Sequence, residues 1–534
     1  MRKLVCCFLL FFSVATAYSQ KAKVPKPPFK VTKAQMYEDY DQFLHIVETY
    51  CPQIEVRMKT GYDMMGVLRE RREMIEKIRN YWEFIQFMDG SVDAILDMHA
   101  RRRVWFPGIP HPRFAPGQSF YDSTGLSAIS EGTQMYVRNS YEKNDKWLWA
   151  LGARYLDGQY YCANHFTFIN KRENDSICFQ NARVIACDRQ PVDMYVRNRM
   201  FSELPASHIL WDVKREKYFT DMLMVDYDNV LKVEEDEKNE FGYGKVYEFV
   251  PNHYGIKISE IANKEIRENY EHYSEIFAKW PCQFVRYFTE QKILYIYTEQ
   301  MYKWENYCLA DTIKKIGAGK EIDKVIVDVR YNPGGGDGFW YDMLSAIIGK
   351  PVWFEYNLAL NGNREVMAYF SAEFPTGMVN EYRKDTIPFL DNKVMWVSHG
   401  TDTIYPDSNS LGYDGKIYIL QGMKTGSAAH SFTSVAWQVP QLVSIGVSTG
   451  QMAGFGLNPW GFQLKHSHYT FSFEPALDIS GAKSWKETFH CMPEIELEPT
   501  LQDVNNEIFM YLLSPEEYLQ KYDYLFKYIM NLKD

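Results

Sequence analysis

The chain has 534 residues, of which 46% are hydrophobic and 24% charged, and this composition is typical of a folded globular protein. The length exceeds that of one ordinary core and predicts several domains. A formal charge of −10 argues against a nucleic-acid surface, because such binding depends on Lys and Arg side chains that neutralise phosphates.

The beginning of the chain predicts an export signal. Two cations precede a mostly apolar run over 4–14, and small residues follow at Ala15, Ala17 and Ser19. This pattern predicts a signal peptide over 1–19, with cleavage after Ala17 or Ser19. The run is too short to span a bilayer, and the sequence offers no other candidate span. We therefore expect an exported protein, periplasmic or extracellular, without a membrane span.

The cysteines and the common metal and nucleotide motifs give no sign of a cofactor. Nine cysteines are present, two of them in the leader, so the rest cannot all pair internally. No C-x-x-C, H-E-x-x-H or P-loop pattern occurs, and "GGGDGF" has Phe where a dinucleotide fingerprint ends in Gly. We expect neither a metal nor a cofactor, and most cysteines as small buried side chains.

Helices are predicted after a linker over 20–31 that is rich in Pro and Lys. Thr32 and Gln35 form a capping-box pattern, and apolar residues then recur at helical spacing. A helical bundle is predicted over 32–106, with "ILDMHARRR" near its end. From 107 to 265 short runs rich in Tyr, Val and Phe alternate with turn residues and predict a β-rich module.

The remaining sequence alternates strands with helices. The segments "ILYIYTE", "YCLADTIKKI", "KVIVDVRYNPGGG" and "FWYDMLSAIIG" predict a largely parallel sheet covered by helices. This α/β pattern occupies 280–355 and 411–505, on either side of an insertion over 356–410. A final helical segment over 506–534 carries a capping box with proline, in the run from Ser514 to Glu517. The predicted fold class is α/β and multidomain.

A glycine-rich loop follows the apolar strand "KVIVDVR". In Asn332-Pro-Gly-Gly-Gly336 the proline ends the strand, and the glycines allow the backbone to approach a ligand closely. Such a loop can direct main-chain N–H groups at a developing oxyanion. A plain tight turn is the alternative interpretation.

Ser427 lies where a second apolar strand passes into a predicted helix, in "GKIYILQGMKTGSAAHSFTSVAW". At the start of that helix the N–H groups of Ser427 and Ala428 lack helical partners, and a nucleophile there would lie at the positive end of the helix dipole. A simple N-cap serine is the alternative.

Together these loops resemble the core of the S41 peptidases, the family of the C-terminal processing (tail-specific) proteases and the tricorn core protease. The resemblance is carried by "KVIVDVRYNPGG", "TGSAAHSF" and "VSIGVSTGQMAG", which are similar to the family's D-x-R-x-N-P-G-G strand end, nucleophile turn and following I-G-x-x-T-x-G element. The segment "ETFHCMPEI" is similar to a later family motif, and "ILDMHARRR" to the L-x-D-x-H-T segment of the tricorn-like branch. The resemblance implies a crotonase-like (ClpP-like) catalytic core and, from a weaker match, a PDZ-like module in the middle.

The resemblance also implies roles for individual residues. Ser427 would be the nucleophile, His99 the general base, and Glu487 the carboxylate that orients the base, as in the tricorn-like branch. The oxyanion hole would combine the N–H of Ala428 with that of a glycine, Gly334 or Gly335. A peptide or protein would be the substrate.

Several positions depart from the family pattern. Met452 stands where we would place the lysine of a Ser–Lys dyad, which disfavours that mechanism, although Lys465 could act as the base from farther along the chain. His430 stands where the family often has Glu, and Met98 where tricorn has a second serine.

Other interpretations stay open. His99 could cap a helix end, and Glu487 could form a solvated pair with Lys486. The whole chain could be a catalytically silent relative that binds a peptide or an apolar ligand in its cleft. The K-T-G before Ser427 and an S-x-x-K at Ser140 also match penicillin-recognising enzymes, but the S-D-N element is missing.

Overall fold

A computed structural model describes most of the chain between residues 26 and 532. The described residues are 26–102, 129, 151–170, 175–200, 209–220, 222–225, 230–238, 244–250, 255–258, 280–303, 308–361, 381–449, 459–489, 492–507 and 509–532. The predicted signal peptide and Met452 lie outside them. Within these segments no helix combines the length and apolar character needed to cross a membrane.

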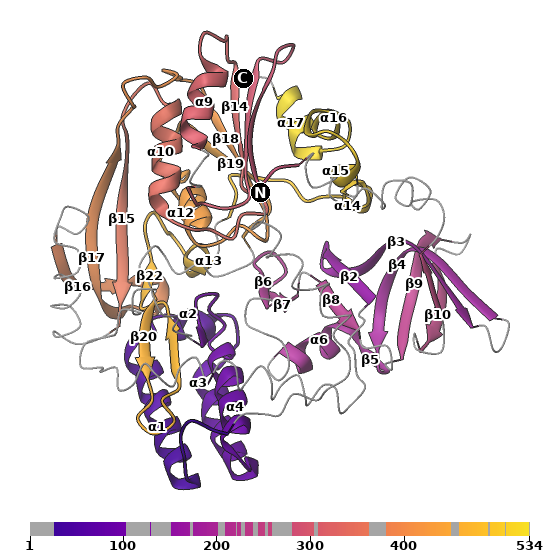
Figure 1. Ribbon diagram of the computed structural model, residues 1–534, viewed down its shortest axis with the longest axis vertical. Coiled ribbons are helices and arrows are strands. Elements are labelled where there is room, and N and C mark those ends of the chain that lie inside the picture. The colour runs from indigo at the N-terminus through magenta and orange to yellow at the C-terminus, as the bar shows by residue number, and fades with distance from the viewer. Residues whose placement is uncertain are drawn as a thin grey trace.

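Helices form the first described region, at the bottom of Figure 1. The predicted capping box is confirmed, because the Thr32 hydroxyl accepts from the Gln35 N–H while the Gln35 side chain accepts from the Thr32 N–H. The apolar faces of these helices pack into one buried cluster that includes Tyr40, Phe43 and Phe84. The elements are α1 (Lys33–Tyr50), α2 (Ile54–Lys59), α3 (Met64–Arg71), the 3-10 helix η2 (Arg72–Lys77) and α4 (Tyr81–Asp93).

The middle of the chain forms an eight-stranded sheet, at the right of Figure 1. Its main path runs β10-β9-β4-β3-β2-β8, with β11 beside β3 and β5 beside β4. The elements of this region are β2 (Leu151–Leu156), β3 (Gln159–Asn170), β4 (Asp175–Cys187), β5 (Gln190–Pro191), α6 (Val192–Met200), β6 (Leu210–Asp212), β7 (Lys217–Phe219), β8 (Met222–Val225), β9 (Leu231–Lys238), β10 (Gly244–Phe249) and β11 (Gly255–Ile258).

A six-stranded sheet of order β12-β13-β14-β18-β19-β23 forms the α/β region. Its strands from β13 to β23 pair in parallel, which confirms the predicted parallel sheet, while β12 is antiparallel. Helices α9, α10 and α12 pack on one face and α16 and α17 on the other (Figure 1). The bounds are β12 (Gln283–Phe288), β13 (Ile293–Thr298), α9 (Leu309–Gly317), β14 (Lys324–Asp328), α10 (Asp337–Ile347), β18 (Ile417–Gln421), α12 (Ala428–Val435), β19 (Leu442–Gly446), β23 (Ile495–Glu496), α14 (Leu501–Asn506), α15 (Phe509–Leu512), α16 (Pro515–Lys521) and α17 (Tyr524–Asn531).

A four-stranded antiparallel sheet of order β16-β17-β15-β22 lies beside this region, at the left of Figure 1. Its elements are β15 (Val352–Leu360), β16 (Glu381–Ile387), the 3-10 helix η5 (Pro388–Leu390), β17 (Lys393–Ile404), β22 (Ala476–Asp478) and the nearby α13 (Trp485–Phe489). The described part of 356–410, predicted as an insertion of mixed texture, therefore supplies most of a sheet.

A three-stranded sheet connects the N-terminal helices to the C-terminal half. Strand β21 (Thr470–Phe473) pairs with β20 (Trp460–Gln463) and with β1 (Arg101–Arg102), directly after the N-terminal helices. Asp39 of α1 accepts the N–H groups of His466 and Ser467 at the hairpin turn, at 2.9 and 2.7 Å. The hairpin is thereby fixed against α1.

The expectation that most cysteines are buried holds for only half of those described. Cys51, Cys162 and Cys187 are buried, whereas Cys178, Cys282 and Cys308 are exposed, and none of these six is in a disulfide. Cys282 and Cys308 directly precede β12 and α9, where the chain enters an element from the surface.

Candidate active site

Ser427 occupies the turn between β18 and α12, as the sequence predicts. Its backbone has φ 48° and ψ −126°, a conformation that non-glycine residues rarely adopt. Ser427 takes the N-cap position of α12, but its side chain makes no capping hydrogen bond. The strained turn therefore presents the hydroxyl for another contact.

That contact is with His99. The Nε2 atom of His99 lies 3.2 Å from Ser427 Oγ, which brings together residues 328 positions apart. His99 follows the end of α4 at Asp93, so it is not a cap in the last turn of that helix. Its main chain is held on both sides, since its N–H donates to Asp97 Oδ1 at 2.8 Å and its carbonyl accepts from Ser472 Oγ at 3.3 Å.

The carboxylate beside His99 is Glu474, not Glu487. Glu474 Oε2 lies 3.6 Å from His99 Nδ1, and the Glu474 side chain is fully buried. Glu487 instead accepts the N–H groups of Lys483 and Ser484 at the start of α13, and this bond to Ser484 measures 3.0 Å. The assignment of Glu487 is corrected accordingly. The sequence motif that contains Glu487 does not indicate in which direction α13 points the Glu487 side chain.

Asp97 accepts hydrogen bonds from the main chains of both His99 and Glu474. This buried carboxylate accepts the His99 N–H through Oδ1 and the Glu474 N–H through Oδ2, each at 2.8 Å. Its Oδ1 also lies 4.0 Å from His99 Nδ1. One side chain thus fixes the two main-chain segments that bring His99 and Glu474 together.

The glycine loop lies against Ser427. A Cβ atom placed on Gly334 would be 2.4 Å from Ser427 Cβ and 3.0 Å from Ala428 N, so only glycine allows this approach, and its φ is +113°. The Gly334 N–H donates to Asn332 Oδ1 at 2.8 Å. Among the described residues no hydrogen bond occupies the N–H of Gly335 or of Ala428. The donors open to a substrate are therefore those of Gly335 and Ala428.

Two acidic side chains near this centre have raised pKa values. Asp337 opens α10 directly after the glycine loop and interacts with Ser431, one turn beyond Ser427. Burial raises the pKa of its carboxyl, although the Trp340 indole donates to it at 3.0 Å. Burial likewise raises the pKa of Asp478, on β22, to about 6. Perturbed carboxyls of this kind are common around functional sites.

His430 belongs to the first turn of α12, three residues after Ser427. It is buried in α12, and its Nδ1 lies 3.0 Å from Thr449 Oγ1. Burial lowers its pKa to about 4, so the ring is neutral at neutral pH. Met98 packs its Sδ and Cε atoms near Gly426 and carries no polar group to the imidazole.

Lys465, the alternative base in the sequence, is exposed on the β20–β21 hairpin, where its main-chain N–H donates to Gln42 of α1 at 3.0 Å.

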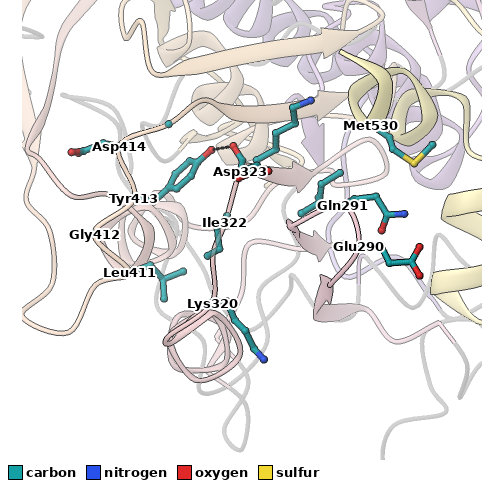
Figure 2. Close-up of a pocket in the computed structure, with 13 residues that line it drawn as sticks. Glu290, Gln291, Lys320, Ile322, Asp323, Leu411, Gly412, Tyr413, Asp414 and Met530 are labelled. Atoms are coloured by element: carbon teal, nitrogen blue, oxygen red, sulfur yellow. Dashed lines mark hydrogen bonds between the residues drawn. The ribbon is translucent and has the colours of Figure 1, made fainter. Parts of the chain in front are cut away.

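A separate open pocket of about 820 Å³ lies at the amino ends of β13, β14 and β18 (Figure 2). Ser427 and the glycine loop follow the carboxyl ends of β18 and β14, so this pocket is at the other edge of the sheet. Within the described part of the chain, no cluster of three or more His, Cys, Asp or Glu side chains could hold a metal ion.

Sequence reasoning missed Glu474 and Asp97 as site residues. Asp97 was visible as the acidic residue two positions before His99 in "ILDMHARRR". Glu474 stands in "TFSFEPALD", directly after an apolar strand, where an isolated acidic residue is a weak signal. Only the pairing of β21 with β1 brings it to His99.

Comparison with known proteins gives a family match for part of the chain and a similar fold. Residues 292–483 match the model of Peptidase family S41. No curated protein matches the sequence. A crystal structure of a serine-to-alanine mutant of CPAF is similar with a TM-score of 0.50 and 14% identity, over 94% of this chain and 98% of that one. At this identity the likeness shows a shared fold.

Two further solved structures are less similar. The photosystem II D1 C-terminal processing protease has a TM-score of 0.35 and 9% identity, over 88% of this chain and 95% of that one. The tricorn protease has a TM-score of 0.31 and 12% identity, over 94% of this chain and 37% of that one. The match to the model of Peptidase family S41 covers residues 292–483, a range that includes Ser427 and Glu474.

Proposed function

We propose that this protein is an exported serine peptidase that hydrolyses peptide bonds through an acyl-enzyme on Ser427. The observation that carries the proposal is the 3.2 Å approach of His99 Nε2 to Ser427 Oγ at the first turn of α12. A hydroxyl in contact with an imidazole, with a carboxylate on the far side of the ring, is the arrangement that activates a serine.

The placement of the residues supports the following proposed steps. His99 Nε2 takes the proton of Ser427 Oγ as the oxygen attacks the substrate carbonyl carbon. The Gly335 and Ala428 N–H groups stabilise the negative charge that develops on the carbonyl oxygen. His99 then gives its proton to the leaving amine as the C–N bond breaks. A water molecule next attacks the acyl carbon while His99 takes its proton, and His99 returns that proton to Ser427 Oγ as the ester C–O bond breaks.

Glu474 would serve this cycle by keeping Nδ1 of His99 protonated, so that Nε2 faces Ser427. The 3.6 Å separation from Nδ1 is longer than a hydrogen bond, and such contacts often tighten only when substrate is bound. Buried within the protein, Glu474 would stabilise the imidazolium that forms during each transfer.

The test is intact mass measurement after reaction with a fluorophosphonate probe. We expect one adduct per chain on the wild type, and none on Ser427→Ala or His99→Ala. Absence of labelling in a preparation shown to be folded would replace the peptidase with a silent protein that binds a peptide or apolar ligand. Labelling that survives His99→Ala would retain the nucleophile and reject His99 as its base.

A further inference from the structure

The C-terminal helix α17 is attached along the central strand that leads into the catalytic loop. Its buried residues Leu525, Phe526 and Ile529 belong to one apolar cluster with Tyr295 of β13 and Ile326 of β14. In Figure 1 the yellow C-terminal helices lie beside this sheet, on the side away from α10 and α12. The helix therefore covers the back of the strand whose carboxyl end passes into the glycine loop.

A charged side chain lies at each end of α17, Lys324 of β14 at the carboxyl end and the N-cap Asp523 at the amino end. Lys324 begins β14, is only 8% exposed, and donates Nζ to the carbonyls of Ile529, at 3.0 Å, and Leu532. At the other end Asp523 is the N-cap, accepting the Phe526 N–H at 2.8 Å. Both charges suit the helix dipole, since a cation lies at its carboxyl end and an anion at its amino end.

Asp523 also reaches the strand end that supports the catalytic loop. Arg330 Nη2 lies 2.7 Å from Asp523 Oδ2 and 2.6 Å from Asp328 Oδ2, so one guanidinium bridges two carboxylates that are each 1% exposed. Tyr295 donates its hydroxyl to the same Asp328 oxygen at 2.6 Å. Buried charges in such a network are costly to leave without a partner, which makes the position of Arg330 sensitive to each carboxylate.

Asn332, two residues after Arg330, connects this segment to the glycine loop and to the turn at Ser427. The Asn332 side chain accepts the Gly334 N–H at 2.8 Å and donates to the Thr298 carbonyl at 3.0 Å. The main-chain carbonyl of Asn332 accepts the N–H of Gly426, the residue before Ser427, at 3.0 Å. A shift of the main chain at 330–332 would therefore move both the glycine loop and the nucleophile turn.

We infer that Asp523 is a positioning residue for the glycine loop and the strand end before it, residues 329–336. It acts through Arg330 and Asn332, so that the C-terminal helix sets the rate of acylation. This inference rests on the proposed function for its catalytic consequence. Its structural part, the dependence of the loop 329–336 on a carboxylate of α17, stands on the contacts alone.

The variant that isolates the charge is Asp523→Asn. An asparagine caps a helix about as well as an aspartate does, so α17 keeps its N-cap while Arg330 loses one of its two carboxylates. The matched control is Asp63→Asn, at the N-cap of α3 in the N-terminal helices, where Asp63 accepts the Gly66 N–H at 2.8 Å. The control measures the effect of changing a capping aspartate as such.

Two readouts are measured on the full-length protein. We expect Asp523→Asn to lower the maximal rate of fluorophosphonate acylation roughly ten- to a hundredfold with unchanged half-saturation, because a small misplacement of reacting groups has effects of that size. Hydrogen exchange of the peptide that contains 329–336 should accelerate. The Asp63→Asn control should match the wild type in both.

The outcomes separate the two proposals. If exchange accelerates only within 514–532 and the acylation rate is unchanged, Asp523 is merely a helix cap and the inference is overturned. If the folded wild type does not react with the probe, the proposed peptidase fails, and faster exchange in 329–336 of Asp523→Asn still supports the structural inference. Equal exchange of this loop in wild type and variant overturns it whatever the probe shows.

Discussion

The two sides of the candidate catalytic centre are built in different ways. Ser427 and the glycine loop follow the carboxyl ends of β18 and β14, which are neighbouring parallel strands of one sheet. His99 and Glu474 come from segments outside that sheet, on either side of the β1–β21 pairing. The nucleophile side depends on backbone geometry within adjacent turns, whereas the base side depends on contacts between distant parts of the chain. Substitutions should therefore affect the two sides differently.

The largest expected effect distinguishes the two candidate carboxylates of the base side. Glu474→Gln should lower the acylation rate roughly 10²- to 10⁴-fold, because the imidazole loses the charge that fixes its tautomer and stabilises its protonated form. Glu487→Gln should leave the rate unchanged, since Glu487 is bonded to the start of α13. Fluorophosphonate kinetics on both variants is the measurement. A large loss in Glu487→Gln, with Glu474→Gln active, would restore the original assignment.

The next effect concerns the backbone of the nucleophile side. Gly334→Ala would place a Cβ 2.4 Å from Ser427 Cβ at a φ of +113°, so the loop must shift. We expect about a 10²-fold loss of acylation rate and a loss of roughly 1–3 kcal/mol in the free energy of unfolding. Gly336→Ala is the matched control, because nothing lies within 4 Å of its Cβ position and its φ is −110°. Equal behaviour of the two variants would contradict the close approach.

A smaller effect is expected at Asp97, whose side chain joins the main chains of His99 and Glu474. Asp97→Asn replaces one of two oxygen acceptors by an amide, so either the His99 or the Glu474 N–H loses its buried partner. A buried donor left without an acceptor costs about 1–3 kcal/mol, and we expect roughly a tenfold slower acylation. Urea unfolding and probe kinetics measure both. Asp41→Asn, on an exposed ion pair with Arg72, should change neither, and an Asp97→Asn variant equal to it would reject the joining role.

The smallest effect on activity comes from His430, whose contribution is to stability. Its pKa is about 4 in the folded protein against an ordinary 6.5, so the unfolded chain binds the proton more readily between these values. Stability from this residue is complete above pH 6.5 and falls as the pH drops towards 4, by up to about 3 kcal/mol. Asp478 opposes this trend, because its raised pKa lowers stability as the pH rises from 3.8 to about 6.

The measurement compares wild type with His430→Gln, which cannot titrate, by urea unfolding at pH 7 and pH 5. The variant should lose less stability than the wild type on acidification, with little change in acylation rate at pH 7. Parallel losses in the two proteins would show that folding does not lower the pKa of His430.

Much of the nucleophile side could be predicted from sequence because its chemistry is local. A proline and glycines after an apolar strand, and a serine between glycine and alanine before a helix, fix the conformation of a few consecutive residues. The N-terminal capping box of Thr32 and the one at Ser514 were predictable for the same reason. Each pattern is read within four residues, and the structure confirms both capping boxes.

The base side was only half predictable. A short motif identifies His99, whereas Glu487 is predicted only from the position of a later segment along the chain. Whether a glutamate meets the imidazole depends on the register of β21 against β1, in which Arg101 faces Ser472. No local pattern encodes that register, since it follows from how the hairpin is held by Asp39 and the other side chains of the N-terminal helices.

The alternating strands and helices, the glycine loop and the strand-to-helix turn at Ser427 follow from local sequence patterns, because short-range sterics and hydrogen bonding decide them. The folded arrangement was needed to see that Glu474 lies beside His99, that Asp97 joins their main chains, and that Asp523 of the last helix contacts Arg330. These contacts join residues far apart in the chain, and their geometry arises from packing between elements.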